Sequence, residues 1–178
     1  MKPYETIESK ITYQGYIVDI KQDLIMLPDG NTAGREIVIR GEAAAVLPVL
    51  DNGDVILIRQ YRHSVEKTVI EIPAGMMDDG DLNPMECALR ELKEETGYTA
   101  GHINLLMKMH TTIGFCTEAI YIYEAGGLTK GETDFDDEEF IEIIKMPLDE
   151  AIGMIYSGGI TDSKAIAALL ATSHRRAL

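Results

Sequence analysis

The 178-residue sequence lacks several features that mark specialised classes of protein. No apolar run approaches the ~20 residues that a membrane-spanning helix needs. The polar N-terminus, MKPYETIESK, contains no apolar signal region. The only two cysteines, Cys87 and Cys116, are too few for a disulfide framework and suit a reducing compartment. We therefore expect a cytoplasmic protein that does not enter a membrane.

Basic residues are also scarce, with 16 Lys and Arg against 30 Asp and Glu, which gives a formal net charge of -14. This balance argues against a nucleic-acid binder, whose surface carries a basic patch. An acidic protein that handles an anionic substrate needs bound cations or a local set of Arg and Lys. Because tryptophan is absent, any aromatic clamp for a base must use Tyr or Phe.

Alternating polar and apolar residues predict a β-rich chain that forms one α+β or α/β-sandwich domain. Residues 4–27 predict two or three strands. The nearly all-apolar Ala43–Leu50 predicts a central strand, and Asp51–Asp54 predicts a hairpin turn into a return strand at Val55–Ile58. Further predicted strands are Arg35–Arg40, Thr68–Ile72, His102–Met109, Ala119–Ala125 and Phe140–Met146.

The predicted helices are Pro84–Thr96, Pro147–Tyr156 and a last one that begins near Asp162. In the first, Asn83 can cap the N-terminus and Gly97 can end the helix in a left-handed conformation. Helical spacing predicts the buried face of each helix. These faces are Met85, Ala88, Leu89 and Leu92; then Leu148, Ala151, Ile152 and Ile155; and last Ile166, Leu169 and Leu170.

Three carboxylates, Glu91, Glu94 and Glu95, fall on one flank of the first helix at ~100° per residue. Arg90 lies four residues before Glu94, where an ion pair is possible. Mg²⁺ prefers oxygen ligands and usually takes one or two carboxylates, water and substrate phosphate. The flank is therefore either a divalent-cation site or, as for most runs of charge, a solvated helix face.

Arg90–Tyr98 (RELKEETGY) resembles the second half of the Nudix box, and Gly75 matches its opening glycine. The box has glycine, five residues, glutamate, seven residues and then Arg-Glu-apolar-x-Glu-Glu-x-Gly-apolar. This chain departs in two ways, because Asp81 replaces the first glutamate and eight residues separate it from Arg90. The insertion leaves the spacing of the three helical glutamates unchanged and makes the role of Asp81 an open question.

Other segments resemble the ADP-ribose pyrophosphatase branch of that family, in the expected order. They are REIV at 35–38, RQYR at 59–62, EIPAG at 71–75, EEFIE at 138–142 and IYSGGITDSKAI at 155–166. The resemblance implies an α/β/α sandwich with a mixed β-sheet and an N-terminal β-strand extension. It also implies a single domain, 1–178, with dimerising strands at 1–40 and a catalytic core at 41–178. The expected homodimer uses its N-terminal strands to help build the partner's site.

The activity that the resemblance implies is hydrolysis of the diphosphate bond of ADP-ribose or a related ADP-sugar. The expected products are AMP and a sugar phosphate, and the expected cofactor is Mg²⁺, with Mn²⁺ as a substitute. Two alternatives remain open. One is another nucleoside diphosphate sugar, such as GDP-mannose, and the other is a module that senses ADP-ribose without cleaving it.

The resemblance also implies roles for individual residues. The metal ligands are Glu91 and Glu95, with Glu94 assisting and a backbone ligand from the Ala74 carbonyl. Glu139, in the acidic loop after the helix, is the expected general base, with Glu138 and Asp137 as rivals, and Glu94 and Arg90 complete the catalytic set. The expected substrate-binding residues, each with a surface or strand-end role as its alternative, are Arg35, Arg59, Arg62, Glu71 and Glu118.

Overall fold

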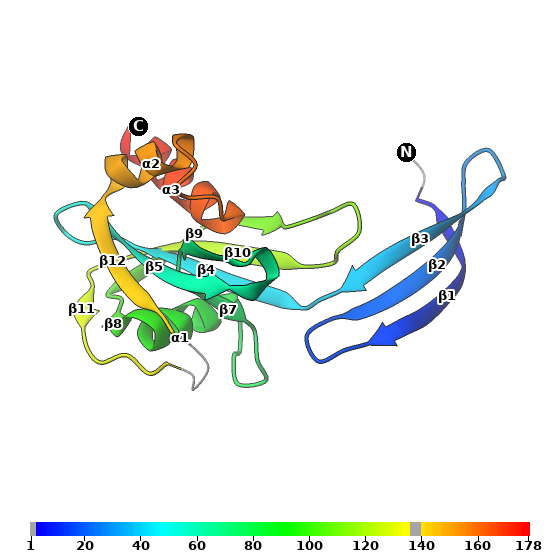
Figure 1. Ribbon diagram of the computed structural model, residues 1–178, viewed down its shortest axis with the longest axis horizontal. Helices are drawn as coiled ribbons and strands as arrows, with labels where there is room; N and C mark the ends of the chain where they lie inside the picture. The colour runs from blue at the N-terminus through cyan, green and yellow to red at the C-terminus, as the bar shows by residue number, and fades with distance from the viewer. Residues whose placement is uncertain (1–2, 136–139) are drawn as a thin grey trace. The chain divides into compact units, whose positions relative to one another are not determined.

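The computed structural model describes residues 3–135 and 140–178 and divides into two compact units (Figure 1). Unit 1 comprises Met1–Gly41 and His110–Ala119, and unit 2 comprises Glu42–Met109 and Ile120–Leu178. Each unit has its own arrangement of strands. In the described part of the chain, no helix is long and apolar enough to cross a membrane.

Unit 1 is a three-stranded antiparallel sheet in the order β1-β2-β3, which confirms the predicted N-terminal strands. The strands are β1 (Glu5–Gln14), β2 (Asp19–Met26) and β3 (Thr32–Ile39). Gly30 closes the turn before β3 with a φ of 87°, a conformation that glycine adopts at little cost. The 110–119 segment joins β3 through Val38, whose N–H donates to the Phe115 carbonyl at 2.7 Å.

Unit 2 contains three sheets in the orders β7-β4-β10-β9, β12-β5-β6 and β11-β8. The strands before the first long helix are β4 (Glu42–Pro48), β5 (Asp54–Arg62), β6 (Lys67–Glu71) and β7 (Ala74–Met76). A short 3-10 helix, η1 (His63–Val65), joins β5 to β6. The later strands are β8 (Tyr98–Thr99), β9 (His102–His110), β10 (Ala119–Gly126), β11 (Thr129–Lys130) and β12 (Glu142–Pro147).

The predicted hairpin at 51–54 is only partly correct. The tight turn exists, because Leu50 N–H donates to the Asp54 carbonyl at 2.9 Å and Gly53 has a φ of 92°. However, β4 and β5 belong to different sheets, joined next to the turn by the single bridge Val49–Val55. Beyond that bridge, β4 pairs with β7 and β10, whereas β5 pairs with β6 and β12.

Helices cover both faces of the strands in unit 2, with α1 (Pro84–Thr96) on one side and α2 (Leu148–Tyr156) and α3 (Ser163–Arg176) on the other (Figure 1). Alternate residues of β4 point to the two sides, as the two-residue period of a strand requires. Leu47 packs in the cluster that contains Leu169 of α3, and Val46 packs in the cluster that contains Leu92 of α1. This arrangement confirms the α/β/α sandwich.

The ends of α1 match the prediction, and its buried face matches in part, since Ala88 and Leu92 are buried as predicted. Met85 is 41% exposed, whereas Cys87, Glu91 and Glu95 are buried beside Ala88 and Leu92. Hydropathy missed Glu91 and Glu95 because they are carboxylates, which are buried here with polar partners. In α3 the prediction for Leu170 is likewise wrong, since it is 37% exposed and the helix buries Lys164 instead.

Candidate active site

The site is built on α1 and on the short strand β7 that precedes it. Asn83 fixes the start of α1, because its Oδ1 accepts hydrogen bonds from Met85 N–H at 3.0 Å and Glu86 N–H at 3.1 Å. Gly97 ends the helix with a φ of 73°. Defined helix ends set which side chains α1 presents to β7.

Between these elements lies a polar hollow of about 280 Å³. β7 contributes Ala74, Gly75 and Met76; α1 contributes Arg90, Glu91 and Glu94; and Asp78 and Asp134 complete the lining. The Asp134 N–H donates to the Glu94 carbonyl at 3.0 Å, which ties the following loop to the helix. Asp78 and Asp134 were missed at the sequence level, although Asp134 opens an acidic segment that could have signalled it.

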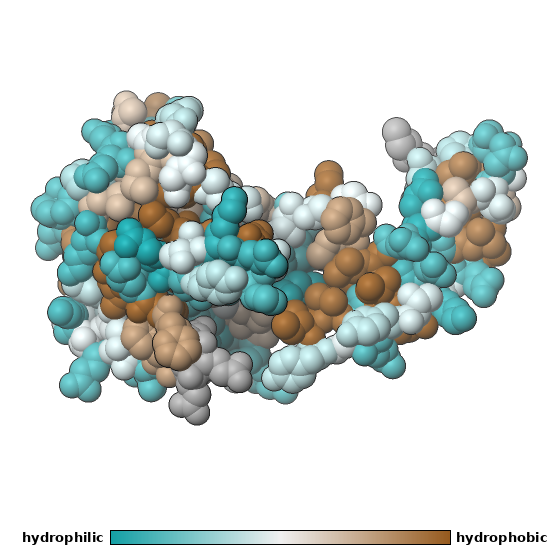
Figure 2. Space-filling view, viewed as in Figure 1, coloured by the Kyte–Doolittle hydropathy of each residue, from teal (hydrophilic) through white to brown (hydrophobic). Residues whose placement is uncertain are grey.

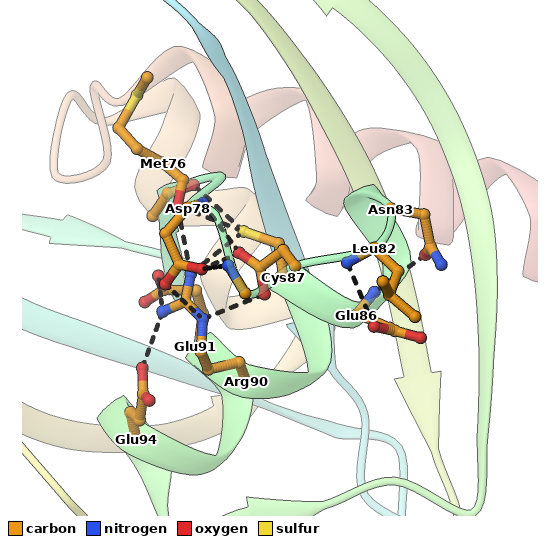
Figure 3. Close-up of polar contacts among 12 residues, drawn as sticks. Met76, Asp78, Leu82, Asn83, Glu86, Cys87, Arg90, Glu91 and Glu94 are labelled. Atoms are coloured by element: carbon orange, nitrogen blue, oxygen red, sulfur yellow. Dashed lines mark hydrogen bonds and ion pairs between the residues drawn. The ribbon is translucent and has the colours of Figure 1, made fainter.

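Arg90 lies at the centre of an ion-pair network at this hollow (Figure 3). Its Nη1 contacts Glu91 Oε1 at 2.7 Å and Glu94 Oε2 at 2.9 Å, which confirms the predicted Arg90–Glu94 pair. Its Nη2 donates to the Met76 carbonyl at 3.1 Å. One guanidinium therefore orients two carboxylates of the helix and the backbone of β7 together.

Asp81 binds the other edge of the same guanidinium. Asp81 Oδ1 accepts from Arg90 Nε at 3.2 Å, and Oδ2 accepts from Nη2 at 2.9 Å. These hydrogen bonds lower the pKa of Asp81 and raise that of Arg90, so both groups stay charged. The inserted residue before α1 therefore does not prevent the contact between Asp81 and Arg90.

Gly75 is required by the position of Glu91. A Cβ added at Gly75 would lie 1.8 Å from Glu91 Oε1 and 2.3 Å from its Cδ. The carboxylate therefore rests against the backbone of β7, and the Glu91 residue is 8% exposed. Glu95 is buried further, at 2% exposed, and its Oε2 accepts a hydrogen bond from Ala74 N–H at 3.1 Å. Both carboxylates are held against β7.

This donor set fits a hard divalent cation. Within residues 3–135 and 140–178, no three His, Cys, Asp or Glu side chains form a ready-made cage for a metal. Mg²⁺ rarely needs one, because water and substrate phosphate usually complete its shell around one or two carboxylates. Arg90 balances the charge of Glu91 and Glu94 in this arrangement. Carboxylates this close together would otherwise repel one another.

A second charged cluster joins β5, β6 and α3. Glu71, 3% exposed, accepts from Arg62 Nε at 2.7 Å and Nη2 at 3.2 Å, and it also contacts the Lys164 ammonium. Burial alone would raise the pKa of Glu71, but the Arg62 hydrogen bond and the Lys164 charge lower it below its ordinary value. Glu71 is therefore an ionised partner of two cations.

Three other predicted residues have polar contacts within their own units. Arg59 in unit 2 pairs with Glu142 at 2.8 Å on the surface. Arg35 and Glu118 belong to unit 1, where exposed Arg35 donates to the Gly34 carbonyl at 2.8 Å and Glu118 pairs with Arg40 at 2.5 Å. The predicted base and its rivals, Glu139, Glu138 and Asp137, lie outside the described residues.

Cys87 lies behind the site and is not a nucleophile. It is fully buried in α1, and its thiol contacts the Gly75 and Met76 carbonyls, each at 3.6 Å. Burial raises its pKa to about 12. A thiol with such a pKa stays protonated and unreactive at neutral pH.

A family model described as the NUDIX domain matches residues 39–169, which span both the second charged cluster and the acidic helix. This chain belongs to the Nudix family. Its fold agrees, because a crystal structure of an "ADP compounds hydrolase" superimposes with a TM-score of 0.89. That match covers 98% of this chain and 95% of the other at 21% sequence identity.

Curated relatives of this Nudix protein carry several different names. It is 38% identical to the "methanol dehydrogenase activator" of Bacillus methanolicus and 35% identical to the "ADP-ribose pyrophosphatase" of Bacillus subtilis (strain 168). Each match covers 93% of this chain and 90% of the relative. It is 31% identical to the "GDP-mannose pyrophosphatase" of Yersinia enterocolitica, with 91% of each chain covered.

Proposed function

We propose that this Nudix protein hydrolyses the diphosphate bond of ADP-ribose or a related ADP-sugar, giving AMP and a sugar phosphate. The observation that carries the proposal is the pair of buried carboxylates, Glu91 and Glu95, which are both held against the β7 backbone. Of the two, Glu91 also lines the polar hollow. Relatives named ADP-ribose pyrophosphatase, similar over most of their length, support the choice of substrate.

The proposed cofactor is Mg²⁺, with Mn²⁺ as a substitute. Glu91, Glu94 and Glu95 would hold it, with a backbone ligand from the Ala74 carbonyl. When bound, a divalent cation neutralises diphosphate charge and lowers the pKa of a coordinated water. Such a cation also resolves the difficulty that a protein of net charge -14 binds a polyanion.

The chain's own residues would position the substrate and accept the proton. Arg90 keeps Glu91 and Glu94 in fixed orientations. Arg62 offers a substrate phosphate the N–H groups that Glu71 does not use, since a guanidinium carries five donors. We still predict Glu139 as the general base, with Glu138 and Asp137 as alternatives. The base would take the proton of the attacking water. Arg35, Arg59 and Glu118 remain candidate substrate contacts.

A second candidate substrate is GDP-mannose. Several relatives named GDP-mannose pyrophosphatase match this chain at 31–34% identity, close to the values for the ADP-ribose group. In this proposal the residues of the hollow would contact phosphate and metal rather than a base, so they favour neither nucleotide. The missing tryptophan means that Tyr or Phe must stack either base.

We also propose that the chain is one Nudix domain that forms a homodimer through its N-terminal strands, in the cytoplasm. Every residue of β1 is exposed, and apolar surface gathers on the N-terminal strands (Figure 2). Ile7, Ile11 and Tyr13 are 45–55% exposed, which is costly unless another surface covers them. Light scattering on a size-exclusion column measures the state directly, and a monomer at micromolar concentration would refute the dimer.

The test of function is a panel of nucleoside diphosphate sugars with Mg²⁺, with products identified by mass. We expect AMP and ribose phosphate from ADP-ribose, no turnover with a chelator, and at least ~10²-fold lower kcat/KM in Glu95→Gln. Glu150→Gln, an exposed carboxylate of α2, is the matched control. Faster turnover of GDP-mannose would move the assignment to the second candidate. If the protein binds ADP-ribose but does not cleave it with either Mg²⁺ or Mn²⁺, it is a sensing module instead.

A further inference from the structure

A buried lysine at the start of α3 has no role in the site described so far. Lys164 is the second residue of α3, and only 9% of it is exposed. Lysine is rarely buried unless it is paired. The N-terminus of a helix also disfavours a positive charge, because the helix dipole is positive there. Such a residue persists only with carboxylate partners that compensate for both effects.

Two carboxylates supply that compensation. The ammonium of Lys164 contacts Glu71 Oε2 and lies 3.0 Å from Asp162 Oδ1. Asp162 is the N-cap of α3, since its other oxygen accepts from Ala165 N–H at 2.8 Å. Lys164 thus links the capped end of α3 to the last residue of β6. Glu71 lies three residues before Ala74, the first residue of the strand that lines the hollow.

Glu71, held by Lys164, in turn fixes the position of Arg62. Its two oxygens bind Nε and Nη2 of Arg62, which fixes the plane of the guanidinium. The Arg62 side chain is 44% exposed, although its carboxylate partner is almost fully buried. Among the described residues, the hydrogen bonds of Arg62 use Nε and Nη2, which leaves Nη1 to bind an anion from solvent.

The four charged groups balance as two cations and two carboxylates. If Lys164 were replaced by a neutral residue, Glu71 would keep Arg62 as its one cationic contact. The buried Glu71 and the half-buried Asp162 would then lose the ammonium that both contact, so repulsion would displace Glu71. The Arg62 guanidinium would lose its fixed orientation as a result.

We infer that Lys164 is a positioning residue that holds Arg62, through Glu71, in the orientation that binds the diphosphate of the substrate. This inference rests on the proposed function. Lys164 acts without touching the substrate, because its ammonium is occupied by Glu71 and Asp162. An interaction made equally with bound substrate and transition state changes KM and leaves kcat unchanged.

The test is a double-mutant cycle with ADP-ribose at saturating Mg²⁺. Lys164→Met should raise KM about tenfold or more with kcat within about threefold, as expected for a weakened hydrogen bond to a charged group. Arg62→Met should raise KM similarly. The double variant should exceed Arg62→Met by no more than about twofold, because both changes remove the same interaction. Lys130→Met, at an exposed lysine of β11, should match the wild type.

An unchanged KM in Lys164→Met would overturn the inference. So would multiplication of the two effects, which would mean that Lys164 contacts the substrate independently of Arg62. If Lys164→Met does not fold, Glu71→Gln with Lys164→Met removes both buried charges and should show the same rise in KM. A wild-type protein that cleaves no nucleoside diphosphate sugar would instead refute the proposed function, so the two failures are distinguishable.

Discussion

Gly75→Ala should inactivate the enzyme without unfolding it. The new Cβ would lie 1.8 Å from Glu91 Oε1, whereas ordinary van der Waals contact begins at 3.4 Å, so the carboxylate must retreat by about 1.6 Å. A misplacement of ~1 Å at a catalytic site costs on the order of 10²-fold in rate. We therefore expect kcat/KM for ADP-ribose to fall at least ~10²-fold and the Mg²⁺ concentration for half-maximal activity to rise.

The fold should tolerate this change because Gly75 does not have a positive φ, so alanine adopts its backbone conformation without strain. The control is Gly153→Ala in α2, where an added Cβ meets nothing within 4 Å. That variant should keep wild-type activity and melt at the same or a slightly higher temperature, since alanine favours helix. Wild-type kcat/KM in Gly75→Ala would refute the placement of Glu91 at the catalytic hollow.

Three further predictions follow from the same contacts. Arg90→Lys should lower kcat/KM by ~10²-fold, because an ammonium cannot bind Asp81 at two points while it orients the helical glutamates; steady-state activity near that of the wild type would contradict the network. Since the pKa of Glu71 is lowered from 4.5, its ionised form stabilises the fold above that value, and this contribution is lost as the pH falls through the lower, folded-state pKa. Thermal melts should therefore show a gap between wild type and Glu71→Gln that is widest near pH 7 and shrinks below pH 4.5, and a gap that does not depend on pH would be inconsistent with the ion pairs. Cys87, with a pKa of about 12, should resist iodoacetamide at pH 8 in the folded protein while the less buried Cys116 reacts, as peptide mass spectrometry would measure; rapid labelling of Cys87 would show that the thiol is accessible.

Features set by local interactions could be predicted from the sequence. Asn83 and Gly97 define the ends of α1 through contacts within a few residues, so the predicted helix has the observed limits. The Arg90–Glu94 pair depends on helical geometry alone. The acidic helix was identified for the same reason, because its three glutamates occupy positions that one turn of helix brings together.

Features set by contacts between distant segments could not be predicted. The turn at Gly53 is local, but the separation of β4 and β5 into different sheets depends on which strands each one meets later in the chain. Lys164 was overlooked because a lysine near a helix start is normally exposed, and only the fold brings Glu71 to it. The prediction that Met85 is buried was wrong for a related reason, since hydropathy ranked Met85 above the buried carboxylate Glu91.

The most direct test of the cation site is Mn²⁺ binding measured by electron paramagnetic resonance, with a non-hydrolysable methylene analogue of ADP-ribose present. The wild type should bind Mn²⁺ in a fixed molar ratio to protein. The double variant Glu91→Gln with Glu95→Gln should lose that binding, although it still melts cooperatively. Equal Mn²⁺ binding by the wild type and the double variant would contradict the assignment of these buried carboxylates as the metal ligands.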